Sequence, residues 1–296
     1  MYGVWIIAGL AACMLALAWQ TNFQKALPVL GTVVLSAILG FAAAKAVYVL
    51  VQLEDTVIYD GLAAFFYLDA DSFCFFGGAA GAFGGILLSA RLFRQPKMEW
   101  LNLAAPCVPL MIAFLRAGEK HLGTIGVGAF VPEGSLLARF PFAVTNSYGE
   151  HLYAIFYLEM LLALVLAIGL LLCRKGKWFS IRAQLCAFYL ALPQIWCESL
   201  RARCIKWGFV RVEQLLCALL VLGMLAYACS RMKGIASAGR RWWPVAVAVL
   251  MIVVIGLLEY ALDKTNIPVT ACYTMMIAAL GVIGLLEGYA IRKRFA

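Results

Sequence analysis

Several charged and amide side chains interrupt the apolar runs of this chain. Lys45 lies well inside the run 26–52, and Arg116 ends the run 100–116. Gln194, Glu198 and Arg201 follow one another at i, i+4 and i+7, so they share one face if this segment is helical. An ionisable group inside a bilayer is costly unless it is paired or belongs to a site. We therefore interpret Lys45 as functional or as part of a buried ion pair, and expect the face of Gln194 to point into the bundle. The alternative for that face is a frayed helix end at the membrane interface.

The basic residues of these segments have the chemistry of a phosphate site. Six of them are predicted at the outer side of the membrane, against the usual bias of Lys and Arg: Arg116, Lys120, Arg201, Arg203, Lys206 and Arg211. An anionic lipid headgroup in the outer leaflet would account for their position, because guanidinium groups bind phosphate oxygens strongly. The alternative is that a few interfacial cations are tolerated without a ligand.

The elements that must position these side chains are apolar. Of 296 residues, 65% are apolar and 13% are charged, and the mean hydropathy is +0.93. A soluble domain has about 45–50% apolar and about 25% charged residues. This composition excludes a soluble globule, a disordered chain and a collagen-like fibre. The net charge is +9, and the basic residues lie between apolar runs. We therefore interpret them as signals for membrane topology and as contacts to anionic lipid, and not as a nucleic-acid surface.

Nine apolar runs are long enough to cross a bilayer: 2–19, 26–52, 72–93, 100–116, 152–173, 183–200, 212–230, 242–262 and 270–291. An alternating strand pattern is absent from the sequence. We predict an all-α, polytopic helical membrane protein with about nine transmembrane helices, the first retained and not cleaved as a signal. The hydrophilic segment 117–151 is expected to be a small ordered loop with some non-helical backbone.

The distribution of Lys and Arg predicts that the N-terminus is outside and the C-terminus inside (N-out/C-in). With this orientation, 15 of the 24 Lys and Arg fall in inside loops. The predicted outside loop 53–71 contains five acidic residues and no Lys or Arg: Glu54, Asp55, Asp60, Asp69 and Asp71.

Two patterns concern packing. Gly77, Gly81 and Gly85 recur at four-residue spacing, which is typical of closely packed membrane helices, and a lipid acyl chain in the same groove is compatible with it. Pro193 should kink the helix that contains it. The ten cysteines form no CxxC and no Cys/His cluster, so we expect small buried thiols and neither a metal site nor a disulfide framework.

Several segments, in the same order along the chain, resemble prolipoprotein diacylglyceryl transferases. Tyr2-Gly3 opens the first helix, as a Tyr-Gly does in that family. The other matching segments, which extend the likeness over about residues 1–225, are AAAKAVYVL (42–50), FFGG (75–78), LAAPCVPLMIAFLRAGE (103–119), HLY (151–153), QIWCESLR (194–201) and GFVRVEQLL (208–216). This chain has Phe76, Glu119 and Gln194 where the family has His, Asn and Arg.

The resemblance implies a seven-helix transferase-like membrane domain over 1–230 and two additional C-terminal transmembrane helices over 231–296. It implies transfer of diacylglyceryl from phosphatidylglycerol to the lipobox cysteine of a prolipoprotein, at the outer face of a bacterial plasma membrane. The implied partners are phosphatidylglycerol, prolipoprotein signal peptides and the lipid bilayer. No nucleic acid, cofactor or metal is expected.

The same resemblance places Arg116 on the family's signature Arg, as a clamp for the lipid phosphate. The candidate catalytic residues are Arg116, Glu119, Glu198, Gln194 and His121; the candidate substrate-binding residues are Tyr2, Lys45, Phe76, Gly77, Gly78 and Arg201. The attacking sulfur belongs to the substrate and must become a thiolate, and Glu119, Glu198, His121 and His151 are open as its base.

Two other functions are compatible with the sequence. One is a non-catalytic lipid-binding or partner-binding membrane paralogue. The other is a small transporter, with Lys45 and the intramembrane Glu residues along its pathway.

Overall fold

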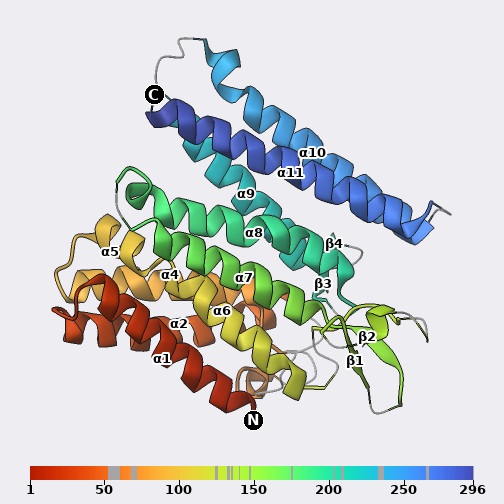
Figure 1. Cartoon of the computed structure of the whole chain (residues 1–296), viewed down its shortest axis with the longest axis horizontal. Coiled ribbons are helices and arrows are strands. Elements are labelled where there is room, and N and C mark those ends of the chain that lie inside the picture. Colours follow the sequence, from red (N-terminus) through yellow and green to blue (C-terminus); the bar gives the residue numbers. More distant parts are fainter. Residues whose placement is uncertain are drawn as a thin grey trace. The chain divides into compact units, whose positions relative to one another are not determined.

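A computed structural model of the protein describes residues 1–52, 61–67, 72–123, 126–131, 134, 136–139, 141–146, 148–174, 176–202, 204–207, 210–232, 237–264 and 267–295. Most of these residues are helical (Figure 1). The chain forms two compact units, the first built from residues 1–186 and 200–213 and the second from 187–199 and 214–296. The predicted acidic residues between 53 and 60 and between 69 and 71 lie outside the described residues, as do Lys175, Arg203 and Lys233.

The first unit contains most of the predicted spans. Its helices are α1 (Tyr2–Gln20), α2 (Ala26–Val51), α4 (Phe75–Leu92), α5 (Lys97–Ala104), α6 (Cys107–Gly118), α7 (Ile155–Leu172) and the first turn of α8 (Arg182–Leu200). A short helix, η1 (Gly61–Phe65), precedes α4. Because a bilayer offers the backbone no hydrogen-bond partner, an apolar run of this length satisfies its peptide groups by forming a helix.

Eight segments of the described chain are long and apolar enough to cross a membrane. They are α1, α2, α4, Lys97–His121, α7, α9 (Val212–Ser230), Gly239–Leu262 within α10 (Ala238–Lys264), and α11 (Val269–Phe295). The prediction of a polytopic helical membrane protein is confirmed. α8 has 19 residues but is less apolar, since it carries Gln184, Gln194 and Glu198. A ninth span and the N-out/C-in orientation stay predictions.

The fourth predicted run is divided into two helices. α5 ends at Ala104 and α6 begins at Cys107, with Ala105 and Pro106 between them. Pro106 has no N–H, so it cannot donate to the carbonyl of Asn102, and its ring crowds the preceding turn. The single helix expected over 100–116 therefore has a break near its start.

The glycine stripe of α4 packs directly on α2. A Cβ atom at Gly81 would lie 2.2 Å from the carbonyl oxygen of Leu39, and one at Gly85 would lie 2.5 Å from the Cα atom of Ser36. At Gly84, on another side of the helix, a Cβ atom would meet nothing within 4 Å. The prediction of a close helix contact is therefore confirmed, and this groove is filled by α2.

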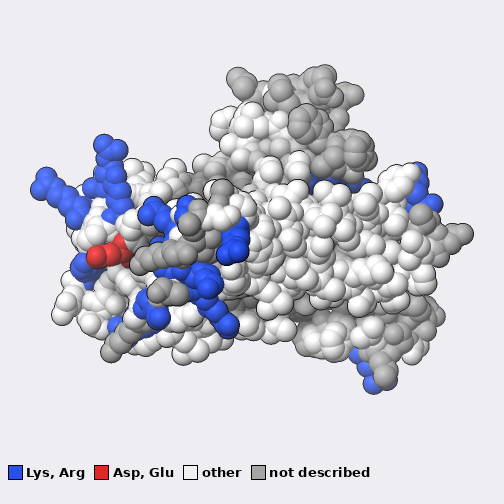
Figure 2. Space-filling model, turned by 90° about the horizontal axis from the view of Figure 1, so that it is seen from above, with Lys and Arg blue, Asp and Glu red and all other residues white. Residues whose placement is uncertain are grey.

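Three connections meet at one end of the first unit. Lys25, after α1, donates to Gln95 before α5 at 2.6 Å. Arg174, after α7, donates to the carbonyl of Trp19 at 3.0 Å and to the side chain of Asn22 at 2.9 Å. These are connections that the sequence predicts to be inside. Figure 2 shows Lys and Arg side chains gathered near one end of the face drawn there, and a mostly uncharged surface beyond them.

The segment between α6 and α7 is ordered where it is described. It contains η2 (Glu119–His121), η3 (Leu136–Ala138) and the antiparallel strands β1 (Ala143–Thr145) and β2 (His151–Tyr153), with Val144 opposite Leu152. Val127, Leu152, Ala154 and Phe156 form its buried cluster. In its described residues, the segment has the non-helical backbone that the sequence predicts. A second short pair, β3 (Lys206–Trp207) and β4 (Val210–Arg211), follows α8.

The second unit joins most of α8 to α9, α10 and α11. The Ser199 hydroxyl of α8 donates to Glu259 of α10 and accepts from Gln214 of α9 at 3.1 Å. Tyr273 of α11 donates to the Ser199 carbonyl at 3.3 Å. Ser199 is thus a contact point for all three later helices. α8 continues through Pro193 as one helix, and the kink there stays a prediction, as does the domain boundary after residue 230.

Candidate functional site

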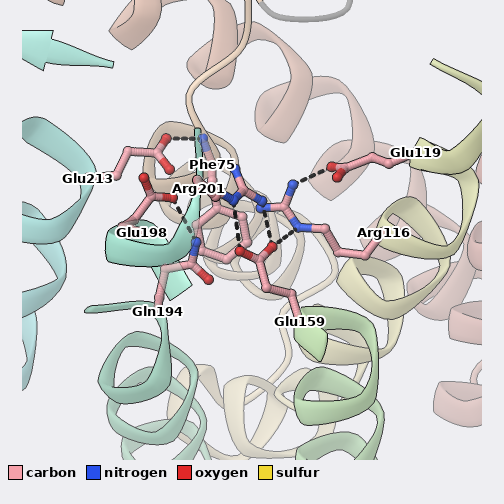
Figure 3. A network of polar contacts seen from close by, with 8 residues as sticks. All are labelled: Phe75, Arg116, Glu119, Glu159, Gln194, Glu198, Arg201 and Glu213. Atoms are coloured by element: carbon pink, nitrogen blue, oxygen red, sulfur yellow. Dashed lines mark hydrogen bonds and ion pairs between the residues drawn. The ribbon is translucent and has the colours of Figure 1, made fainter. Parts of the chain in front are cut away.

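Two arginines share one buried carboxylate inside the first unit (Figure 3). Arg201 binds Glu159 through two nitrogens, with Nε 2.9 Å from Oε1 and Nη2 2.5 Å from Oε2. Arg116 Nε lies 2.6 Å from the same Oε2. Arg116 Nη1 also donates to Glu119, three residues further along the chain. The side chains of this network are at most 11% exposed.

Each charged residue of this network lies at or close to the end of an apolar helix. Arg116 stands in the last turn of α6, and Glu119 follows in η2. Glu159 lies near the start of α7, and Arg201 comes directly after α8. Two guanidinium groups and two carboxylates cancel formally, so burial leaves no net charge in the network. The arrangement holds two cations close together, which their repulsion would otherwise prevent.

Arg116 keeps one donor without a partner. Its Nη2 atom is buried and has no hydrogen-bond partner among the described residues, and the same is true of Glu119 Oε2. The guanidinium carbon lies 5.2 Å from the centre of the Phe75 ring, so one face of the group is covered by an aromatic side chain. A fixed, buried guanidinium with a remaining N–H pair is suited to an anionic oxygen atom.

The backbone closes tightly around Glu119. Gly126 has φ +71°, in the left-handed region that favours glycine, and a Cβ atom there would lie 2.2 Å from Glu119 Oε2. Gly118 is similarly restricted, because a Cβ atom would lie 2.7 Å from the ring of Tyr2. Tyr2, a predicted substrate-binding residue, is thereby placed against the end of α6, two residues from Arg116.

The start of α4 is held from two sides. Glu213, in the first turn of α9, accepts the N–H of Phe75 at 2.5 Å. The N–H of Cys74 donates to the carbonyl of Ala44 at 3.0 Å, which ties the start of α4 to α2. The predicted residues Phe76, Gly77 and Gly78 form the first turn of α4 and are positioned by these bonds.

Lys45 lies beside the same region. Its side chain is buried, its Nζ atom donates to Ser72 at 2.8 Å, and it lies 5.5 Å from the ring centres of both Tyr48 and Phe73. That Lys45 is functional or part of a buried ion pair stays a prediction. Whether it binds substrate stays a prediction.

Gln194 and Glu198 lie on the part of α8 that belongs to the second unit. Gln194 Nε2 donates to Glu198 Oε1 at 3.0 Å, so the predicted shared face is confirmed for these two residues, whereas Arg201 comes after the end of α8. Their convergence with Arg116 stays a prediction. His121 is exposed at the end of η2, and His151 pairs with Thr145 at 3.1 Å in the β1–β2 hairpin.

The sequence analysis did not include Glu159 or Glu213 among the candidate site residues, although Glu159 is one of the intramembrane Glu residues of the transporter alternative. A carboxylate within the apolar run 152–173 is the signal that could have identified Glu159. For Glu213 the signal is weaker, namely an acidic residue at the start of the run 212–230. Across the described residues, no three His, Cys, Asp or Glu side chains are grouped as metal ligands, and all ten cysteines, each of them described, are free thiols.

The apolar helices and the buried arginine–carboxylate network define a multi-pass membrane protein with a site suited to an anionic group. The family model for prolipoprotein diacylglyceryl transferase matches residues 1–229. The chain therefore belongs to this family of diacylglyceryl transferases, which act in lipoprotein biosynthesis. The match ends within α9, and α10 and α11 follow it. No curated protein matches the chain significantly.

Proposed function

We propose that this protein transfers diacylglyceryl from phosphatidylglycerol to the lipobox cysteine of prolipoproteins, at the outer face of a bacterial plasma membrane. The observation that carries the proposal is the hydrogen bonding of the Arg116 guanidinium group. Two carboxylates fix its guanidinium group, and one buried nitrogen has no partner among the described residues. A phosphate oxygen would complete its hydrogen bonds.

The chemistry of the transfer needs such a group. The substrate thiolate attacks a glyceryl carbon, a thioether forms, and glycerol phosphate leaves with additional negative charge on its phosphate. A cation already fixed in place stabilises that charge without reorganisation. Arg116 supplies the direct contact to the phosphate. Arg201 adds positive charge close by, because both arginines bind Glu159.

The direction in which the helices run supports a site at the outer face of the membrane. α5 begins at Lys97, directly after the connection in which Gln95 binds Lys25, and α6 follows it and carries Arg116 in its last turn. α7 runs from Glu159 back toward Arg174. Since basic loops stay inside, the network of Arg116 belongs at the outer side.

The decisive experiment reconstitutes the full chain in vesicles that contain phosphatidylglycerol labelled in its acyl chains, and adds a lipobox peptide. The expected result is a labelled peptide whose mass increases by one diacylglyceryl group, with release of glycerol phosphate. A peptide with Ser in place of the lipobox Cys is the matched control and should stay unlabelled. Phosphatidylglycerol binding without any transfer would decide for a non-catalytic lipid-binding paralogue.

A further inference from the structure

Phe75 stands between a cation and a carboxylate at the start of α4. Its ring lies beside Arg116, 5.2 Å from the guanidinium carbon. Its backbone N–H donates to Glu213 at 2.5 Å. Figure 3 shows Arg116 and Glu213 on the two sides of this residue, and all three belong to the first unit. The site therefore holds a carboxylate that is separate from the arginine network. Only Phe75 lies between this carboxylate and Arg116, the proposed phosphate ligand.

The carboxylates of this unit differ in what they contact. Glu119 is ion-paired with Arg116, and Glu159 is ion-paired with both Arg116 and Arg201. Glu213 is 5% exposed and forms no ion pair among the described residues. Its hydrogen-bond donors are neutral groups, the N–H of Phe75 and the Cys74 thiol.

Glu213 retains the capacity to accept a proton. A carboxylate has about four lone-pair positions, and the hydrogen bonds from the Phe75 N–H and the Cys74 thiol use two of them. The Cys74 thiol is a titratable neighbour of Glu213. The side chain of Phe76, the next residue of α4, cannot accept a proton.

We propose that Glu213 is the general base that deprotonates the lipobox thiol, an inference that rests on the proposed function. The thiol proton passes to Glu213 as the sulfur forms its bond to the glyceryl carbon. The bond between that carbon and the phosphate oxygen breaks, and its electron pair remains on glycerol phosphate beside Arg116. Glu213 then gives the proton to water when the products leave.

Glu213→Gln tests this role with little change in shape. The amide oxygen of Gln can still accept the N–H of Phe75, so the start of α4 is retained, but the side chain no longer takes up a proton. At pH 7 we expect transfer to fall about 10²–10⁴-fold, the usual contribution of a general base, with phosphatidylglycerol binding unchanged. Glu99→Gln, at an exposed position of α5, is the matched control and should transfer normally.

The pH profile separates a base from a structural carboxylate. A free cysteine thiol ionises near pH 8.5, so above that pH the substrate supplies its own thiolate. The deficit of Glu213→Gln should therefore shrink to within about tenfold by pH 9, the pH at which most of the thiol is already ionised. Equal losses at every pH would overturn the role of a base, and normal transfer at pH 7 would overturn it directly.

A second pair of variants covers the case in which Glu213→Gln fails to fold. Glu213→Asp and Glu213→Asn have the same size and differ in the proton acceptor, so the Asp variant should be the faster of the two at pH 7. Equal rates would contradict the proposal. An inactive wild type would refute the proposed function and the base together, whereas an active wild type with an unaffected Glu213→Gln variant would refute the base alone.

Discussion

Arg116 is the residue on which both the sequence motif and the network geometry converge. It is fixed by Glu119 and Glu159, and one buried nitrogen has no partner among the described residues. The shared Glu159 also couples Arg116 to Arg201, so a change in either arginine alters the environment of the other. At this scale the site is a set of charges that hold one another in place, and its members should not behave additively.

Replacing Arg116 should have the largest effect of any single change in the network. We expect Arg116→Ala to reduce transfer about a hundred- to a thousandfold, which corresponds to about 2.7–4 kcal/mol, as for loss of one transition-state donor. Arg116→Lys should keep part of the activity, because an ammonium group cannot hold two carboxylates and a phosphate in one plane. Rates with labelled phosphatidylglycerol measure both, and Arg139→Ala at an exposed position is the control. Unchanged transfer by Arg116→Ala would contradict the assignment.

Gln194 offers a test in the opposite direction. It donates to Glu198 one turn further along α8, so an arginine at this position would have a carboxylate available to pair with. If Gln194 marks a weakened site, Gln194→Arg should raise the transfer rate severalfold at saturating peptide. A lower rate would mean that the site is adapted to a neutral group at this position.

At the scale of elements, helix contacts decide where the charged residues meet. α4 approaches α2 so closely that the α4 backbone lies against Leu39, Ala43 and Ser36. The start of α4 is also held by Glu213, which accepts the N–H of Phe75. The break at Pro106 and the turn into η2 similarly set the position of Arg116 at the end of α6.

Two glycines of α4 provide a matched pair for this contact. Gly81→Ala would place a methyl group 2.2 Å from a backbone oxygen of α2, so the helices must separate, and we expect a loss of about 1–3 kcal/mol in stability. Gly84→Ala meets nothing within 4 Å and should be neutral or slightly stabilising. Thermal unfolding of both variants in the same detergent compares them. Equal unfolding temperatures would show that the α2–α4 contact is less rigid than the structure implies.

At the scale of the whole molecule, charge and hydropathy determine the relation to the membrane. Eight described segments can span a bilayer, and the chain carries a net charge of +9 that collects in connections between them. The interpretation of an outer-face site depends on this distribution and on the proposed N-out/C-in orientation.

Reporter fusions test the orientation directly. A reporter fused after residue 232 or after residue 296 should report the cytoplasmic side, and a cysteine-labelling reagent that cannot cross membranes should not reach a single cysteine introduced at either place. An external C-terminus would overturn the orientation and, with it, the outer-leaflet site.

The sequence by itself determined the membrane-spanning helices and the family, and it selected Arg116 as a candidate site residue. Hydropathy and motifs are local properties, and a bilayer allows an apolar run little choice but a helix. The tertiary structure alone decided the partners. Glu159 and Arg201 are 42 residues apart and Phe75 and Glu213 are 138 apart, so no spacing along the chain predicts that they meet. Each pair forms because helix packing brings distant polar groups together in a place where lipid cannot satisfy them.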